Sequence, residues 1–333
     1  MQEILLILLK SIRKNIKNIM SDNFFKVIRS GINTTFQDLG RNNLNHIGIP
    51  ISGIMDKRNY IIANKILQNS PSHPIIEYAY QGPRLVYHGE PLNISVSGDV
   101  KFKIFKNKNE IEGKCYETIT LEDQDEIDLI STNRSVYGYL AIGADLKIDY
   151  QWKSCSINTK ANIGSNKGKK LQDNQKIEVS KIKELSRRKL DHINSKIENI
   201  RVIKGTNFHY FSKESQSKFF KNEYSVTKLT DRMGMRLEGE RLENIVNTNI
   251  KSEGLVKGVI QIPADGNPII MLADHGTIGG YPKIATVISA DFDKLSQLTP
   301  GSKIKFKEVN LKDAETIFKL YEMETNNIIS KIL

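Results

Sequence analysis

Apolar and polar residues alternate in short runs along the first half of the chain, from Phe24 to about Ser180. The clearest runs are residues 92–96, 101–105, 115–121 and 137–142. A period of two is typical of β-strands that bury one face. Clusters of Gly, Asn and Asp separate these runs, as expected for hairpin turns. The pattern therefore predicts a β-rich first domain.

The same pattern resumes after residue 199 and predicts a second β-rich domain. Its expected strands are residues 200–203, 224–229, 258–262, 268–272 and 303–306. Short strands with only a few helices between them favour barrels or sandwiches over a doubly wound parallel sheet.

Three helices are expected among these strands. Asp56 can cap a first helix, in which Tyr60, Ile61, Asn64 and Leu67 share one face. A short helix with an aspartate cap is expected over residues 291–298. The spacing of Leu311, Ile317, Leu320 and Tyr321 predicts a terminal amphipathic helix.

These elements divide the chain into five segments: an N-terminal extension (1–23), a first domain (24–180), a linker (181–199), a second domain (200–310) and a C-terminal helix (311–333). The linker is polar, charged and free of glycine, so we expect it to be mobile or partly helical. The apolar run at residues 4–9 is too short to span a bilayer, which takes roughly 20 apolar residues. Charges follow this run and no cleavage site appears, which disfavours a secretory signal. We favour an upstream extension of the reading frame, with the working start at Met20, over a membrane-surface role.

Composition and charge narrow the class of protein. The 333 residues are 39% hydrophobic, which disfavours disorder. The formal charge is +11, but residues 1–20 contribute +3 and residues 181–201 contribute +4. The rest of the chain has no basic stripe interleaved with aromatic residues, so a nucleic-acid partner is not expected. Cys115 and Cys155 form neither a disulfide framework nor a metal motif, so we expect a reducing, cytoplasmic setting.

Common catalytic motifs are absent from the sequence. Residues 164–170 resemble a phosphate loop but lack its spacing and its final Ser or Thr. No G-x-G-x-x-G follows a strand, no G-x-S-x-G occurs, and no two histidines have helical zinc spacing. There is no Met-Lys-Met sequence, so we expect no covalent biotin on this chain.

Two polar, glycine-rich constellations stand out instead. The first covers residues 30–41 and 48–56, and the second covers residues 230–239, 252–254, 261–263 and 274–282. Glycines let the backbone approach a ligand, and arginine binds carboxylate or phosphate in a bidentate way. The mixture suits a small anionic substrate. Surface ion pairs and turns are the alternative interpretation of the same residues, and Asn64 is equally compatible with a hydrogen bond to a neighbouring loop.

The constellations carry several long motifs in order: G-x-x-T-T-x-Q-D-x-G-R, G-x-P-x-S-G-x-M-D, D-R-M-G-x-R-L-x-G, S-E-G, G-x-I-Q-x-P-x-x-G-x-P-I and G-G-Y-P-x-I-A. In these motifs the chain resembles the family of the 5-oxoprolinase C subunit. That family is also called allophanate hydrolase subunit 2 and is related to the carboxyltransferase part of urea carboxylase. The resemblance covers about Phe24 to Phe306.

The resemblance implies a mainly β fold of two cyclophilin-like β-barrel domains with a few short helices and a C-terminal helix. It also implies a heteromeric complex with the B and A subunits of 5-oxoprolinase, which opens the lactam ring of 5-oxoproline to L-glutamate with ATP and Mg²⁺. An amide in an unstrained ring is a poor electrophile, and phosphorylating its oxygen activates it. Positive groups then stabilise phosphate oxygens and the substrate carboxylate.

Site residues follow from the same resemblance. Arg41, Arg232 and Arg236 are candidate anion clamps, and Asp38, Asp56 and Asp274 are candidate bases or magnesium ligands. For Asp56, a helix cap alone is an alternative explanation. The expected substrate-binding residues are Thr34, Thr35, Gln37, Ser52, Gly53, Asn64, Gln261, Thr277, Gly279, Gly280 and Tyr281.

The chain also departs from the family pattern. Where the family commonly reads D-x-Q-T-T-G-G-Y-P, residues 274–278 read Asp-His-Gly-Thr-Ile, and the stretch expected to read like L-G-S-x-S-T is Trp152-Lys153-Ser154-Cys155-Ser156. Two alternatives to the oxoprolinase hypothesis therefore stay open. One is a carboxyltransferase-type protein that acts on urea or a related amide with carboxybiotin. The other is a non-catalytic regulator that binds an inhibitor of a sensor kinase, where that inhibitor resembles the B subunit.

Overall fold

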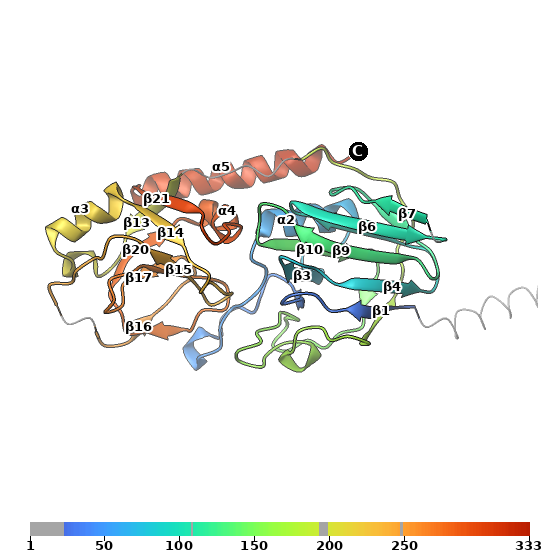
Figure 1. Cartoon of the computed structure of the whole chain (residues 1–333), viewed down its shortest axis with the longest axis horizontal. Coiled ribbons are helices and arrows are strands. Elements are labelled where there is room, and N and C mark those ends of the chain that lie inside the picture. Colours follow the sequence, from blue (N-terminus) through green and yellow to red (C-terminus); the bar gives the residue numbers. More distant parts are fainter. Residues whose placement is uncertain (1–22, 108, 193–198, 247–248) are drawn as a thin grey trace, which may run out of the picture.

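A computed structural model describes residues 23–107, 109–192, 199–246 and 249–333 of the chain. Nearly all of the predicted N-terminal extension therefore lies outside the described residues. Two β-rich units lie side by side, and the C-terminal helix α5 (Leu311–Ser330) runs along both of them (Figure 1). The predicted mainly β fold with few helices and a C-terminal helix is confirmed.

The first unit consists of two β-sheets that share a core of buried apolar side chains. The larger sheet has seven strands in the order β11 (Asp145–Leu146), β12 (Lys176–Ser180), β1 (Phe24–Arg29), β4 (Arg84–His88), β9 (Glu126–Thr132), β6 (Val100–Lys106) and β7 (Asn109–Glu112). The smaller has five, in the order β2 (Thr35–Gln37), β3 (Ile75–Ala79), β10 (Tyr137–Ile142), β5 (Leu92–Ser97) and β8 (Ile119–Leu121).

Strands β5 and β10 of the smaller sheet are buried on both faces, although their alternating sequences predict one exposed face. Every residue of β5 and β10 is buried, including Asn93, Ser95 and Ser97. Helix α2 (Lys57–Ile66) packs on both strands and covers the polar face. The hydroxyl of Ser97 donates to the carbonyl oxygen of Asn59 at 2.9 Å. The Ser97 hydroxyl thus contacts a helix rather than water, while the Asn93 amide donates to the Ser186 carbonyl of the linker at 2.8 Å.

The second unit closes into a barrel of seven strands. Around the barrel the order is β13 (Asn199–Lys204), β20 (Lys283–Val287), β17 (Val259–Gln261), β18 (Ile269–Met271), β15 (Gly234–Glu238), β14 (Glu223–Val226) and β21 (Lys303–Glu308). β13 and β21 run parallel, and the other neighbouring strands of the barrel are antiparallel. A separate two-stranded ribbon pairs β16 (Glu253–Gly254) with β19 (Ile278–Gly279).

Some expected strands are shorter than predicted, for local reasons. The run over residues 115–121 is a regular strand only at β8, because Tyr116 adopts a left-handed backbone with φ of +64°. Glu117 instead pairs with Lys189 in an isolated bridge. Lys189 belongs to the predicted linker, whose described residues 181–192 contain no helix and run along the first unit. The linker residues 193–198 lie outside the described part of the chain.

All three predicted helices form, and the differences from the sequence lie in their caps, their lengths and one further helix. Asp56 caps α2, since its side chain accepts the backbone N–H of Asn59. Helix α4 (Phe292–Ser296) lacks the expected side-chain cap, because the Asp291 carboxylate binds Arg201 instead. Helix α3 (Lys213–Lys221), which the sequence analysis missed, begins at a Ser212 cap. Short 3-10 turns complete the set: η1 (Asn45–Ile47), η2 (Asn166–Gly168), η3 (Phe208–Tyr210) and η4 (Ser289–Asp291).

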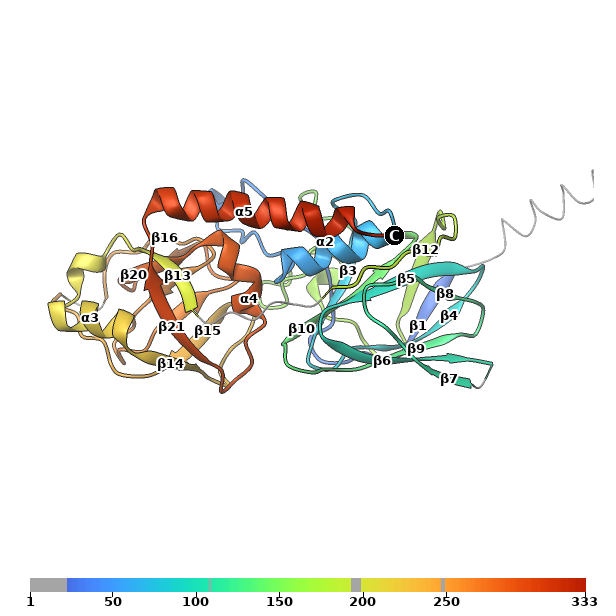
Figure 2. The ribbon, with the colours of Figure 1, turned by 90° about the horizontal axis from the view of Figure 1, so that it is seen from above.

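Helix α5 lies against both units and beside α2 (Figure 2). Its inward face differs from the prediction, because Leu311 and Leu320 are 63% and 57% exposed while Tyr321 is buried. The guanidinium of Arg58 lies 4.5 Å from the ring centre of Tyr321 and donates to Thr325. No helix in the described segments combines the length and apolar character needed to cross a membrane.

A single apolar core crosses the junction between the two units. Tyr60 and Tyr139 of the first unit belong to the same buried cluster as Phe292 and Leu295 of the second. Packing of this kind holds two domains in one fixed arrangement. Side chains at the junction therefore keep constant neighbours, which makes the junction a suitable place for a functional site.

Candidate functional site

Two segments of the first constellation pack directly against each other. The backbone N–H of Arg41 donates to the Ile51 carbonyl at 2.9 Å, and that of Ile54 donates to the Asp38 carbonyl at 3.0 Å. Gly40 and Gly53 both have left-handed φ values, of +84° and +88°. A Cβ atom on Gly53 would lie 2.9 Å from the backbone nitrogen of Gly40. The glycines of this motif therefore allow a close approach of two backbones.

Asp38 binds the loop of residues 154–156, which follows strand β11 in the chain. Its Oδ1 accepts from Ser154 Oγ at 2.6 Å, from Ser156 Oγ at 2.6 Å and from the Gly40 N–H at 2.8 Å. Its Oδ2 accepts the backbone N–H of Cys155 at 2.8 Å. These contacts engage the oxygens that the prediction assigned to a base or a magnesium ion. Asp38 thus positions the loop of residues 154–156.

Arg41, the single cation in the sequence of the first constellation, is buried with 1% exposure. Its Nη2 donates to the Ser156 carbonyl, whereas Nε and Nη1 have no hydrogen-bond partner among the described residues. Burial lowers the pKa of Arg41, while the nearby carboxylates of Asp38 and Asp274 act in the opposite direction. Buried polar atoms in proteins are rarely left unpaired. Arg41 therefore fits the predicted role of an anion clamp.

Two neighbours of Arg41 in sequence also carry buried oxygens without a partner in the described part of the chain. These are Thr34 Oγ1 and Gln37 Oε1, although Gln37 Nε2 donates to Thr35 Oγ1 at 2.9 Å and to the Ile157 carbonyl at 2.8 Å. Both oxygens belong to residues that the sequence assigned to substrate binding. The segment from Thr34 to Arg41 thus concentrates buried groups that can accept a polar partner.

Arg232 is bound by protein groups through most of its guanidinium. Its guanidinium forms a bidentate pair with Asp274, at 2.8 and 3.1 Å, and a second ion pair with Glu77. Nη2 also donates to the Gly53 carbonyl at 2.6 Å. Arg232 and Asp274 come from the second unit and Glu77 and Gly53 from the first, so this buried cluster connects the units. It leaves Arg232 few donors for a substrate anion and Asp274 little capacity for a metal ion.

A chain of hydrogen bonds continues from Glu77 through the first unit. Tyr139 is hydrogen-bonded to Glu77 and accepts the backbone N–H of Asp56 at 2.8 Å. Asp56 Oδ2 accepts from Asn59 Nδ2 at 2.7 Å and from Gln297 of the second unit at 3.0 Å. Burial, with the nearby Asp293 carboxylate, raises the pKa of Asp56 to about 7. Asp56 is a helix cap in a buried interdomain network.

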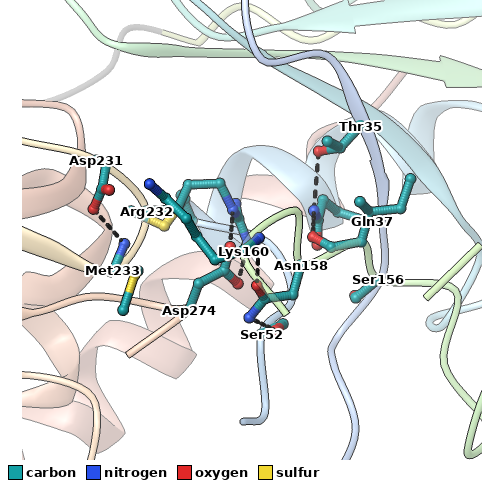
Figure 3. A network of polar contacts seen from close by, with 12 residues as sticks. Thr35, Gln37, Ser52, Ser156, Asn158, Lys160, Asp231, Arg232, Met233 and Asp274 are labelled. Atoms are coloured by element: carbon teal, nitrogen blue, oxygen red, sulfur yellow. Dashed lines mark hydrogen bonds and ion pairs between the residues drawn. The ribbon is translucent and has the colours of Figure 1, made fainter. Parts of the chain in front are cut away.

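The remaining predicted residues fall into separate groups. Ser52 accepts from Asn158 at 3.2 Å and lies close to the Arg232–Asp274 pair, with Thr35 and Gln37 to the right (Figure 3). A second group surrounds the β16–β19 ribbon, where Gln261 donates to the Tyr281 carbonyl at 3.1 Å and packs against Gly279. Thr277 and Gly280 contribute backbone carbonyls to this ribbon.

Two predicted residues lie outside these groups. Arg236 is exposed on β15, and no ion pair involves it among the described residues. Asn64 is buried on α2, where it donates to the His73 carbonyl at 3.2 Å and accepts from Asn69 at 2.8 Å. The contacts of Asn64 are therefore those of the alternative interpretation, a hydrogen bond to a neighbouring loop. For Arg236, no contact in the described part of the chain supports the role of an anion clamp.

A polar hollow of about 340 Å³ adjoins Asp38. A larger groove of about 600 Å³, between β6, β8 and the C-terminus, contains none of the motif residues. We therefore place the candidate site at the motif loops. Within the described ranges, no group of three or more His, Cys, Asp or Glu side chains could hold a metal ion.

The sequence analysis missed several residues of the network. Glu77 lies inside the apolar strand Ile-Ile-Glu-Tyr-Ala, and a single acid in such a strand indicates a buried ion pair. Ser154 and Ser156, which bind Asp38, keep the two serines of the family's L-G-S-x-S-T stretch, but the altered residues Trp152 and Lys153 before them left this stretch out of the predicted site. Tyr139 and Gln297 carry no local signal, because their partners come from distant parts of the chain.

Fold and site together define a two-unit β protein whose glycine-rich loops build a buried polar site at the junction between the units. The chain belongs to the carboxyltransferase domain, subdomain A and B family, whose model matches residues 47–308. This match confirms the resemblance drawn from the motifs.

Relatives with curated names support the same assignment. The chain is 31% identical to the 5-oxoprolinase C subunit of Haemophilus influenzae over 303 residues, covering 88% of this chain and 94% of the relative. It is 28% identical to the 5-oxoprolinase C subunit of Escherichia coli, covering 87% and 92%. The K. lactis urea amidolyase structure shares the fold with a TM-score of 0.83 at 24% identity, covering 94% of this chain and 21% of that one.

Proposed function

We propose that this chain is the C subunit of an ATP-dependent 5-oxoprolinase, which acts with the B and A subunits to convert 5-oxo-L-proline to L-glutamate in the cytoplasm. Two relatives of nearly the same length carry the name of the 5-oxoprolinase C subunit. The observation that carries the proposal is the Arg41 guanidinium, buried beside Asp38 with Nε and Nη1 unpartnered among the described residues.

Arg41 has the chemistry for an anionic oxygen of the substrate. A guanidinium fork binds carboxylate in a planar, bidentate way, and the interaction is stronger where water is excluded. The Ser156 hydroxyl donates to Asp38, and Arg41 Nη2 donates to the Ser156 carbonyl. These two bonds fix the guanidinium and so fix the direction of Nε and Nη1. In the isolated chain these nitrogens are shielded from solvent. We therefore propose that the substrate reaches them only in the complex with the B subunit.

The three predicted aspartates do not fit a magnesium site by themselves. Asp38 and Asp56 accept hydrogen bonds on both oxygens, and Asp274 is paired with Arg232. We therefore propose that ATP and Mg²⁺ are held chiefly by the partner subunits. In this proposal the chain itself binds and orients the lactam acid.

The test is reconstitution of the complex from this chain and its cognate B and A subunits. We expect ATP hydrolysis that depends on 5-oxo-L-proline and yields glutamate. Arg41→Met should lower this turnover at least about thirtyfold, equivalent to about 2 kcal/mol for a charge-assisted hydrogen bond. The matched control is Arg236→Ala, which removes an exposed arginine and should leave turnover unchanged. A complex that forms but shows no 5-oxoproline-dependent hydrolysis would reject the proposal.

A second candidate function has its own support in the family description, which names a carboxyltransferase domain. In that case the chain would transfer a carboxyl group between carboxybiotin on a separate carrier and urea or a related amide. The same reconstituted complex, supplied with a biotinylated carrier and urea, distinguishes the two. A stable complex inactive in both assays would favour the regulatory alternative.

A further inference from the structure

The hollow beside Asp38 has the size of a small-molecule site and a lining rich in polar side chains. Its volume of about 340 Å³ falls within the range of roughly 300–1,000 Å³ typical of ligand pockets. Its polar walls come from three parts of the first unit, namely the residue after β2, the loop after α2, and β11 with the segment that follows it. The lining residues used below are Asp38, His73, Asp145, Tyr150 and Lys153.

Lys153 reaches the wall of this hollow from a strained turn. Gln151 and Ser154 exchange backbone hydrogen bonds of 2.9 and 3.2 Å, which leaves Trp152 and Lys153 as a two-residue loop. Both residues have left-handed backbones, with φ of +51° and +63°. Such a conformation costs a residue with a side chain about 1–2 kcal/mol, and strain of this kind clusters at functional sites. Glycine at this position would avoid the strain, so the presence of lysine indicates a role for its side chain.

The charges around the hollow are complementary to a particular kind of ligand. Lys153 is exposed and forms no ion pair within the described residues, so its ammonium is available to an anion. Asp145 pairs with the exposed Lys181, at 3.2 Å, and Asp38 Oδ2 accepts the Cys155 N–H. Burial, with the nearby Lys183, lowers the pKa of His73, so this imidazole adds no positive charge near neutral pH. The hollow is thus lined by one lysine without an ion pair among the described residues and by two carboxylates.

We propose that the hollow binds a small carboxylic acid with an adjacent N–H donor, such as an amino acid or a lactam acid. Lys153 binds the carboxylate, and Asp38 and Asp145 accept from the N–H group. This site is distinct from Arg41, which does not line the hollow. The inference rests on the proposed function only for the choice of 5-oxo-L-proline as the first probe.

The test uses the full chain and isothermal titration calorimetry with three probes. 5-Oxo-L-proline has a carboxylate and a lactam N–H, L-glutamate has a carboxylate and an ammonium, and 2-pyrrolidinone lacks the carboxylate. We expect at least one of the two acids to bind at least tenfold more tightly than 2-pyrrolidinone. The comparison of the two acids shows whether an ammonium or a lactam N–H is preferred.

Lys153→Gly removes the ammonium and relieves the strained backbone, so it should fold at least as stably as the parent chain. It should weaken binding of the preferred acid at least tenfold and leave 2-pyrrolidinone unaffected. The matched control is Lys167→Gly, because Lys167 is also an exposed lysine with a left-handed backbone (φ of +55°) and lies outside the hollow. Lys167→Gly should relieve the same strain without changing affinity.

Two results would overturn the inference: no binding of either acid by the parent chain, or equal affinities of the parent chain and Lys153→Gly. The proposed function fails independently of these results, when the reconstituted complex shows no 5-oxoproline-dependent ATP hydrolysis. A complex that turns over 5-oxoproline while Lys153→Gly binds like the parent would reject the inference and retain the function.

Discussion

The carboxylate of Asp293 accepts the backbone N–H of Arg58 at 3.0 Å, so a residue of the second unit closes the N-terminus of helix α2 in the first. The same carboxylate accepts the Lys57 N–H at 3.0 Å and the hydroxyl of Tyr321 on α5. Unpaired N–H groups and the helix dipole make this end of α2 favourable for an anion. Three elements from distant parts of the chain thus meet at one buried carboxylate.

Replacement of this carboxylate should weaken the whole chain. We expect Asp293→Ala to lower the free energy of unfolding by about 1–3 kcal/mol, because it leaves three buried donors without an acceptor. Urea unfolding measures the effect. Asp149→Ala is the control, since Asp149 is exposed, and it should change stability by less than about 0.5 kcal/mol. Similar effects of the two substitutions would contradict this account of the junction.

Arg232 provides a stronger test of the junction. Arg232→Met should cost about 3–5 kcal/mol, because it leaves the buried carboxylates of Glu77 and Asp274 without a counter-charge. Arg236→Ala, further along the same segment but exposed, should change stability little. Chemical denaturation of both variants checks the prediction. A cost for Arg232→Met as small as that for Arg236→Ala would show that the ion-pair cluster does not hold the units together.

The Arg232–Glu77 pair also shows what sequence reasoning could and could not reach. Alternation of apolar residues located β5, β6 and β10, and the Asp56 cap located α2, because these signals are local. Arg232 and Glu77 are 155 residues apart, and no local pattern specifies that two charges so distant will meet in a buried junction. The motifs identified Arg232 as important, but they could not distinguish a structural ion pair from a substrate clamp.

The first constellation shows the same limit on a smaller scale. The motifs selected Asp38 and Arg41, and the structure brings both to the loop of residues 154–156. Ser154 and Ser156 keep the serines of the family stretch, but no local pattern specifies that they bind a carboxylate 116 and 118 residues earlier in the chain. The hollow was equally hidden, because its walls come from segments that are adjacent only after the sheets have formed.

Stability should depend on pH through Asp56. The folded pKa of Asp56 is about 7, above its ordinary value of 3.8, because burial and Asp293 disfavour the charged form. The folded chain therefore holds this proton more tightly than the unfolded chain does. Its contribution to stability is complete below about pH 4 and is lost progressively as the pH rises from there through 7, with a magnitude on the order of 4 kcal/mol.

Asp56→Asn tests this dependence, because asparagine still caps a helix but carries no titrating group. Between pH 5 and pH 8 the free energy of unfolding should fall for the parent chain and fall much less for the variant. The difference between the two chains isolates Asp56 from other titrating residues. Parallel pH profiles would show that Asp56 ionises normally in the folded state.

Gly53 should be essential both to the fold of the motif and to the site. Gly53→Ala adds a Cβ atom 2.9 Å from the Gly40 nitrogen and 3.0 Å from the Leu39 carbonyl carbon, at a residue whose φ is +88°. Backbone atoms cannot yield as a flexible side chain does, so residues 38–41 and 51–54 must separate. Their separation would displace Arg41, whose N–H is bonded to Ile51. We expect a loss of more than about 2 kcal/mol of stability, together with most of the 5-oxoproline-dependent turnover.

Gly48→Ala distinguishes this steric effect from backbone strain alone. Gly48 has a similar φ of +82°, but a Cβ atom there would meet nothing within 4 Å. Alanine at this position should therefore cost only the left-handed conformation, about 1 kcal/mol, and the site should keep its activity. Thermal unfolding and turnover of the two variants give the comparison. If Gly48→Ala lowered stability and turnover as much as Gly53→Ala, backbone strain would explain both effects. The close approach of the two motif segments would then not be needed to position Arg41.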